Sequence, residues 1–227
     1  MEKNQEPKAH SAEYFGEYRD FWWNLDFLKL MSVRLGLERT ERALDVGCGV
    51  GHWGLLMSRV LPETVRWTGV DFEASHVEKA AGLAERQGVA GRFEFEQANA
   101  MSLPYPDGMF DLVTCQTLLI HLKDPKDGLR EMLRVLKPGG IVLVTEPNNF
   151  AACAVFSSLT EKQSVDEVME RLKFELLIER GKKALGLGFN SEGDLIPGYL
   201  AQLGAETVQV YLSDKAVPYF APYAGAD

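Results

Sequence analysis

Three glycines at alternate positions, Gly47, Gly49 and Gly51, follow a short apolar run of the chain. Glycine lacks a Cβ and adopts positive φ without strain, so a ligand can lie directly against the backbone N–H groups of such a turn. A helix is expected to begin after the turn, and helix N-termini attract negatively charged groups. The spacing therefore predicts a binding turn for a nucleotide-type cofactor, with Asp45 and Cys48 beside the glycines.

A dinucleotide is one alternative for this cofactor, because G-x-G-x-x-G can also be read at Gly49, Gly51 and Gly54. That fingerprint places its first glycine directly at the end of the strand. Here the strand is expected to end at Gly47, two residues earlier, and His52 then occupies the position of the third glycine. A nicotinamide-dependent oxidoreductase is therefore the weaker interpretation.

Two further strands are expected to deliver polar residues to the same edge. The run from Val65 to Val70 ends in Asp71 and Phe72, which places a carboxylate where it can accept hydrogen bonds from both hydroxyls of a ribose. Residues 92–96 alternate with period two, which indicates a strand. The segment that follows this strand contains Asn99 and Ala100.

Alternation of strand and helix signals continues to residue 146. A fourth strand over 108–116 ends in Gln116, and a helix over 129–137 stops at Pro-Gly-Gly before a fifth strand over 141–145. Such alternation predicts an α/β protein with a mostly parallel sheet and helices on both faces. Ligands of such sheets bind at the carboxyl ends of the strands.

Taken in order, the motif Asp45-x-Gly47-x-Gly49-x-Gly51, the strand ending in Asp71 and the later strands resemble class I S-adenosylmethionine-dependent methyltransferases. The resemblance covers about residues 40–149. It implies a Rossmann-like, doubly wound sheet with strand order 3-2-1-4-5. It also implies S-adenosylmethionine as cofactor, S-adenosylhomocysteine as product, and methyl transfer to a small-molecule acceptor.

The same resemblance implies roles for individual residues. Asn99 replaces the Asp common at its place in the family, and its amide can still contact the adenine; it is otherwise a turn residue that bonds its own backbone. His121 is the candidate general base, with a structural histidine as the default alternative. Arg19 belongs to a helical lid that covers the cofactor or simply packs on the core. The implied cofactor-binding residues are Asp45, Gly47, Cys48, Gly49, Gly51, Asp71, Phe72, Asn99, Ala100, Gln116 and Arg19.

Four parts of the chain are expected: an N-terminal tail and helical lid (1–38), the cofactor-binding core (39–149), a helical cap insertion (150–190) and the C-terminal part of the core (191–227). Ser164 and Glu167 form a capping-box signature for a helix over 165–183. Residues 191–203 suggest a short helix, and residues 207–212 suggest a sixth strand. The tail after residue 212 does not resemble the last, antiparallel strand of the family, so we expect a shortened sheet or a truncated chain.

Composition limits the possible partners. The 227-residue chain has a net charge of −9 and no run of Lys and Arg longer than Lys182-Lys183, which disfavours nucleic acid. No apolar stretch approaches the length of a membrane span. The three cysteines show no metal-ligand spacing with the histidines, so we expect free thiols, no metal and a cytoplasmic location. A protein of this fold that binds the cofactor without catalysis remains the alternative to an enzyme.

Overall fold

The computed structural model describes residues 23–153 and 162–213 of the chain. The expected lid residue Arg19 therefore lies outside the described residues, together with the rest of segment 1–22. No helix among the described residues is long and apolar enough to cross a membrane.

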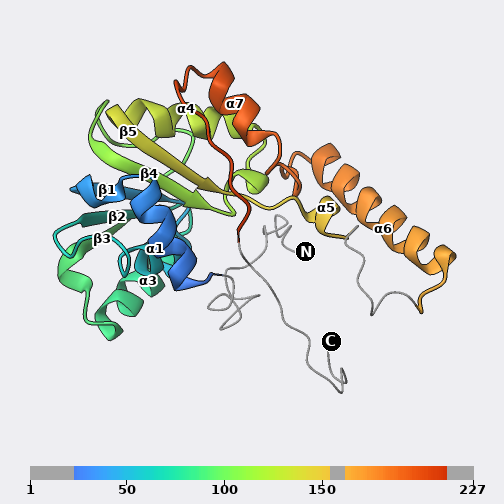
Figure 1. Cartoon of the computed structure of the whole chain (residues 1–227), viewed down its shortest axis with the longest axis horizontal. Helices are drawn as coiled ribbons and strands as arrows, with labels where there is room; N and C mark the ends of the chain where they lie inside the picture. The colour runs from blue at the N-terminus through green and yellow to red at the C-terminus, as the bar shows by residue number, and fades with distance from the viewer. Residues whose placement is uncertain (1–22, 154–161, 214–227) are drawn as a thin grey trace, which may run out of the picture.

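Five parallel strands form a single sheet in the order β3-β2-β1-β4-β5 (Figure 1). This order confirms the predicted doubly wound fold, in which successive strands are added outward on either side of β1. Its register aligns the ends of neighbouring strands, since Val46 pairs with Val70 and Asp71 pairs with Gln97. The strands are β1 (Arg42–Val46), β2 (Arg66–Asp71), β3 (Phe93–Gln97), β4 (Phe110–Gln116) and β5 (Leu136–Thr145).

Helices cover both faces of this sheet (Figure 1). Alternate residues of a strand point to opposite faces, so Leu44 and Val113 contribute to one apolar cluster while Ala43 and Leu112 contribute to the other. The first cluster includes residues of α4 (Pro125–Val135) and α7 (Ile196–Gln202), and the second includes residues of α1 (Leu25–Arg34) and α2 (His52–Met57). The connections also contain α3 (Ala74–Arg86) and the 3-10 turns η2 (Leu37–Arg39), η3 (Ala90–Arg92) and η4 (Leu119–His121).

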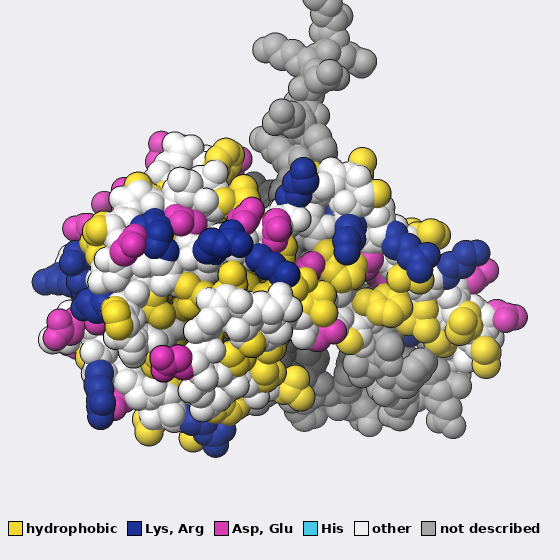
Figure 2. Space-filling view, turned by 90° about the horizontal axis from the view of Figure 1, so that it is seen from above, with side chains coloured by type: hydrophobic (Ala, Val, Ile, Leu, Met, Phe, Trp, Pro, Cys, Tyr) yellow, Lys and Arg dark blue, Asp and Glu magenta, His cyan; other side chains and the backbone are white. Residues whose placement is uncertain are grey.

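After β5 the chain forms α5 (Asn149–Cys153) and the long helix α6 (Val165–Ala184), which projects away from the body of the molecule (Figure 1). The predicted capping box begins α6: the Glu167 N–H donates to Ser164 Oγ at 3.2 Å, and the Ser164 N–H donates to Glu167 Oε2 at 2.7 Å. Hydrophobic side chains are visible along the projecting part (Figure 2). That residues 150–190 form a cap over the binding site remains a prediction.

The predicted sixth strand is wrong. Residues 207–212 form no strand and no backbone hydrogen bond with the described part of the chain. They line the same groove as residues 141–145 of β5, whose outer edge has no neighbouring strand among the described residues. Alternating β-branched residues favour a strand only where a partner accepts their backbone hydrogen bonds. The tail from residue 214 lies outside the described residues.

Two boundaries near β5 also differ from expectation. The helix α4 begins at Pro125, where the Asp124 side chain caps it, and ends at Val135 instead of residue 137. The strand β5 is already paired with β4 at Leu136, and its register shifts before Ile141. The Pro-Gly-Gly sequence therefore forms an irregular part of the strand rather than the stop of the helix.

Candidate functional site

A cleft of about 1980 Å³ runs along the carboxyl ends of the strands and continues beside β5. Most of the predicted site residues meet there, although they come from four different strand ends. Those lining it are Gly47, Gly49, Asp71, Phe72, Asn99, Ala100, Gln116 and His121. Asp45, Cys48 and Gly51 are not among the residues that line the cleft.

The glycine turn after β1 has the conformation that its residues predict. Gly47, Gly49 and Gly51 have φ values of +68°, +53° and +89°, which only glycine adopts readily. The Cys48 N–H donates to the Val70 carbonyl at 2.8 Å, which ties the turn to β2. A Cβ on Gly47 would lie 2.5 Å from Leu118 Cδ1, so another residue at this position would displace that side chain.

The Asp71 carboxylate lies at the end of β2 and faces this turn. Its Oδ2 accepts the Gly49 N–H at 2.8 Å, and its Oδ1 accepts the Glu73 N–H at 3.0 Å. His76 Nδ1 is 3.1 Å from the same Oδ1, and its side chain is only 21% exposed. The sequence patterns above assign no role to His76. The sequence signal for this contact is only the i+5 spacing of His76 from Asp71 across the start of α3, which is too common to select it.

Asp45 is buried beneath the turn, with an exposed fraction of 2%. Its Oδ2 accepts the Gly54 N–H at 3.0 Å, while Oδ1 accepts no hydrogen bond from the described residues. Burial raises the pKa of Asp45 to about 8, against the effect of the Gly54 hydrogen bond and with a smaller contribution from Asp71. In this geometry the Asp45 carboxyl group is buried and fixes the turn, and it does not line the cleft.

Cys48 is also buried, and its Sγ lies at 3.5 Å from the carbonyl oxygen of Gly49. Burial raises the pKa of its thiol, so the neutral form dominates near pH 7. Cys48 and Cys115 are free thiols, as predicted. Cys48 thus contributes its backbone to the turn and its side chain to the core.

The segment after β3 supplies the other wall of the cleft. Asn99 Oδ1 accepts the Met101 N–H at 2.9 Å, so the amide oxygen stabilises its own turn and the NH₂ group is the part suited to a ligand. Ala100 is buried, with an exposed fraction of 9%, and Phe72, which also lines the cleft, is 67% exposed. A carboxylate, an amide and apolar flanks together suit an adenosyl group: its ribose carries hydroxyls, and its flat base stacks on apolar side chains and forms hydrogen bonds at its edge.

A second turn, after β4, closes the cleft on its other side. Gln116 ends β4, and Thr117 has a φ of +54°, the only positive value among the described residues other than glycine. Glu146, directly after β5, accepts the N–H groups of Leu118 and Leu119 at 2.7 and 2.8 Å through Oε1. Burial raises the pKa of Glu146 to about 7, although these hydrogen bonds and Lys182 lower it. The sequence patterns above assign no role to Glu146; the available signal was an acidic residue directly after an apolar strand.

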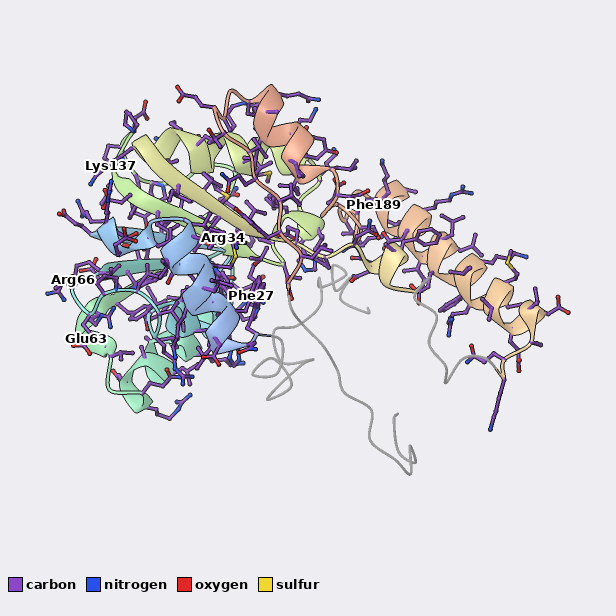
Figure 3. All side chains as sticks on the ribbon, in the orientation of Figure 1. Phe27, Arg34, Glu63, Arg66, Lys137 and Phe189 are labelled. Carbon is purple, nitrogen blue, oxygen red and sulfur yellow. The ribbon has the colours of Figure 1, made fainter. Side chains whose placement is uncertain are left out.

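His121 lies at the end of η4, where its N–H donates to the Leu118 carbonyl at 2.9 Å. The same turn is held by the C-terminal end of α6 and by the residues that follow it. Lys182 Nζ donates to the Ile120 carbonyl at 3.0 Å, and the Phe189 N–H donates to that oxygen at 3.0 Å. Phe189 lies where the chain returns from α6 to the body (Figure 3). The position of the His121 backbone therefore depends on contacts with the region after β5.

Sequence comparison identifies related proteins. The family described as "Methyltransferase domain" matches residues 37–188, which is more than half of the chain. The methyltransferase YcgJ of Bacillus subtilis is 35% identical over 143 residues, covering 63% of this chain and 54% of that protein. The ubiquinone/menaquinone biosynthesis C-methyltransferase UbiE of Azotobacter vinelandii is 40% identical over 111 residues, covering 49% and 44%. The chain thus spans about half the length of these curated relatives.

Solved structures confirm the fold. A SAM-dependent methyltransferase from Aquifex aeolicus has a TM-score of 0.60 and 17% identity, with 87% of each chain covered. A second solved structure, of a protein from Methanococcus maripaludis, has a TM-score of 0.59 and 14% identity, covering 88% of this chain and 84% of that one. At such identities the likeness concerns the fold alone.

Proposed function

The chain belongs to the methyltransferase-domain family, and we propose that it binds S-adenosylmethionine and transfers the methyl group to a small-molecule acceptor. The observation that carries this proposal is the contact between two motifs distant in sequence. The glycine turn after β1 and the carboxylate after β2 meet directly, because the Gly49 N–H donates to Asp71 Oδ2 at 2.8 Å.

Each group on this edge fits one part of the cofactor. Asp71 would accept hydrogen bonds from the ribose hydroxyls, and the Asn99 NH₂ group would donate a hydrogen bond to a ring nitrogen of the adenine. Phe72 and Ala100 would flank the adenine. Gly47 and Gly49 leave room for the methionine portion beside Gln116. Since Asp71 already accepts two backbone N–H groups and lies 3.1 Å from His76 Nδ1, we expect the contact with His76 or Gly49 to lengthen when a ribose binds.

The bound sulfonium would supply an activated methyl group with a good leaving group. The residues of the chain then have to orient the two reactants and exclude water, and good alignment alone lowers a barrier of this kind by several kcal/mol. No strong base is required unless the acceptor loses a proton. His121, at the cleft, is the candidate for that task when the acceptor is a hydroxyl or an amine.

A small acceptor fits the charge of the protein better than a nucleic acid does. The net charge is −9, and acidic and basic side chains are interspersed on the face that Figure 2 displays. The name of the relative UbiE specifies methylation of a carbon atom in quinone biosynthesis. We propose no particular acceptor atom on that basis, because the same fold serves many acceptors.

Calorimetric titration of the purified, cofactor-free chain tests the proposal. We expect S-adenosylmethionine and S-adenosylhomocysteine to bind with micromolar dissociation constants, and NADH not to bind. Asp71→Ala should weaken both adenosyl ligands about 100-fold, because a buried polar contact worth about 3 kcal/mol is lost. Binding of NADH alone would favour the oxidoreductase, and binding of adenosyl compounds without turnover on any acceptor would favour a non-catalytic role.

A further inference from the structure

Glu146 occupies an unusual position in the cleft. Its carboxylate is buried, with Oε1 bonded to the N–H groups of Leu118 and Leu119, while Oε2 accepts no hydrogen bond from the described residues. A buried carboxylate with one unsatisfied oxygen is costly for a folded protein. A residue that lowers the stability of the fold in this way often has a function. The contacts of Glu146 indicate which function this is.

The turn that Glu146 holds is strained. Thr117 adopts φ of +54°, a conformation that costs a β-branched residue of order 1–2 kcal/mol, and strain of this kind persists only where surrounding contacts enforce it. Two contacts do so here. The Thr117 N–H donates to the Thr145 carbonyl at 2.9 Å, and Glu146, the next residue, accepts the two N–H groups that follow Thr117.

This strained turn places one side chain against the glycine turn. Leu118 lies over Gly47 so closely that a Cβ on Gly47 would be 2.5 Å from Leu118 Cδ1 and 3.1 Å from Leu118 Cβ. The backbone N–H of this same Leu118 is held by Glu146 at 2.7 Å. A path of direct contacts therefore runs from Glu146 through Leu118 to Gly47.

We propose that Glu146 is a positioning residue of the cofactor site: its carboxylate holds the turn after β4 in the strained conformation that seats Leu118 on Gly47 and fixes the glycine turn for binding. The proposal rests on the proposed function, because it assumes that this cleft binds an adenosyl cofactor. Glu146 acts through Leu118 and need not touch the cofactor or the reacting atoms.

The ionised form of Glu146 is the form suited to this role, since a carboxylate accepts N–H hydrogen bonds more strongly than a neutral carboxyl group. Among the described residues, the titratable groups that interact with it are the Cys115 thiol of β4 and the Lys182 ammonium of α6, while η4 presents backbone N–H groups. Lys182 favours the ionised form. Because the pKa of Glu146 is about 7, its hydrogen bonds to the turn after β4 weaken as the pH falls below neutrality.

Calorimetric titration with S-adenosylhomocysteine, which lacks the sulfonium charge, tests the proposal in the full chain. At pH 8 we expect Glu146→Ala to weaken binding about 100-fold and Glu146→Gln, whose amide oxygen still accepts, only about 10-fold. At pH 6 the Gln variant should bind as wild type does. Wild-type affinity for the Ala variant at pH 8, or an equal loss for Gln and Ala, would overturn the proposal.

Glu179→Gln is the matched control. Glu179 is also a buried carboxyl group, 2% exposed, which accepts the Asn190 N–H at 2.9 Å and the Ser191 hydroxyl at 3.0 Å, and neither of these hydrogen bonds involves the turn after β4. Its replacement should leave the affinity within about twofold of wild type. An equal loss in the Glu179 and Glu146 variants would mean a general structural role and would overturn the proposal.

Amide hydrogen exchange separates this proposal from the proposed function. In cofactor-free protein, Glu146→Ala should accelerate exchange at Leu118 and Leu119 at least tenfold, because both N–H groups lose their acceptor. Unchanged exchange would overturn the proposal even if cofactor binds. If wild type binds neither adenosyl compound, the proposed function fails, and the exchange rates alone decide whether Glu146 holds the turn.

Discussion

Two turns enclose the candidate cofactor site, and they obtain similar backbone conformations in different ways. The turn after β1 contains three residues with positive φ, and all three are glycines. The turn after β4 contains one such residue, Thr117, and no glycine lies in it. Its conformation is enforced from outside, by Glu146 almost thirty positions further along the chain.

This difference separates local from long-range specification of structure. Glycine makes positive φ inexpensive, so the first turn keeps its shape without help and its glycines mark it in the sequence. The second turn needs a tertiary contact to offset its strain, so nothing within residues 116–121 identifies it. The two turns meet where Leu118 covers Gly47. Variants on either side of this contact can test whether the distinction is real.

Gly47→Ala should have the largest effect, because it damages the point where both turns meet. The alanine would have to keep φ of +68°, and its Cβ would lie 2.5 Å from Leu118 Cδ1. Left-handed strain and overpacking together should lower the free energy of unfolding by about 4 kcal/mol. Urea unfolding, monitored by circular dichroism, measures the loss, and titration with S-adenosylhomocysteine should detect no binding.

Gly88→Ala is the control for backbone strain alone. Gly88 has φ of +71°, but a Cβ there would meet no atom within 4 Å. Its loss should be about 1 kcal/mol, without an effect on cofactor affinity. Equal losses for the two variants would show that the contact between Leu118 and Gly47 contributes nothing.

The parts of the structure that sequence predicts well are those specified by neighbouring residues. The parallel sheet follows from the alternation of strands and helices, while its strand order was implied by the family resemblance. The first turn of α6 follows from Ser164 and Glu167, which are three residues apart. Residues 207–212 also have the composition of a strand, yet they form none. A helix cap is completed within its own segment, whereas a strand needs a partner that its own residues do not specify.

The site divides in the same way. Gly47, Gly49 and Asp71 could be predicted from the residues at the strand ends, and the structure brings them together. Two contacts could not be anticipated, those of His76 with Asp71 and of Glu146 with the turn after β4, because each depends on a side-chain direction set by tertiary packing. An acidic residue directly after a strand, or a histidine near the start of a helix, is too common in sequences to identify these two contacts.

The second prediction concerns the cost of holding a turn by a buried carboxylate. The pKa of Glu146 rises from an ordinary value of 4.5 to about 7, so the folded protein binds this proton more tightly than the unfolded chain does. Stability from the protonated group is complete below pH 4.5 and is lost as the pH rises through 7, which amounts to about 3 kcal/mol at most. The Glu146→Gln variant has no titratable group at this position, so it does not lose this stability as the pH rises.

We therefore expect the free energy of unfolding of Glu146→Gln, relative to wild type, to increase by up to about 3 kcal/mol between pH 5 and pH 8. Chemical denaturation at both pH values, without cofactor, measures this difference. A variant that is more stable but binds cofactor less well at pH 8 is expected when a residue is kept for function at the expense of stability. A difference that stays constant with pH would show that Glu146 does not titrate in this range.

The smallest effect is expected when the second turn is made to resemble the first. Thr117→Gly removes the left-handed strain at φ of +54°, worth about 1–2 kcal/mol, but increases the freedom of the unfolded chain by about 1 kcal/mol. The net change in unfolding free energy should therefore lie within about 1 kcal/mol of zero.

Coupling between this change and Glu146→Ala is the informative quantity. If Glu146 serves to enforce a strained turn, its removal should matter less once glycine adopts that conformation freely, so the loss of cofactor affinity should shrink by about 1 kcal/mol in the Thr117→Gly background. The double-mutant cycle, measured with S-adenosylhomocysteine at pH 8, provides this value. Strictly additive losses would mean that Glu146 supports the cleft in some way other than through the strain at Thr117, and the contrast between the two turns would then reduce to their glycine content.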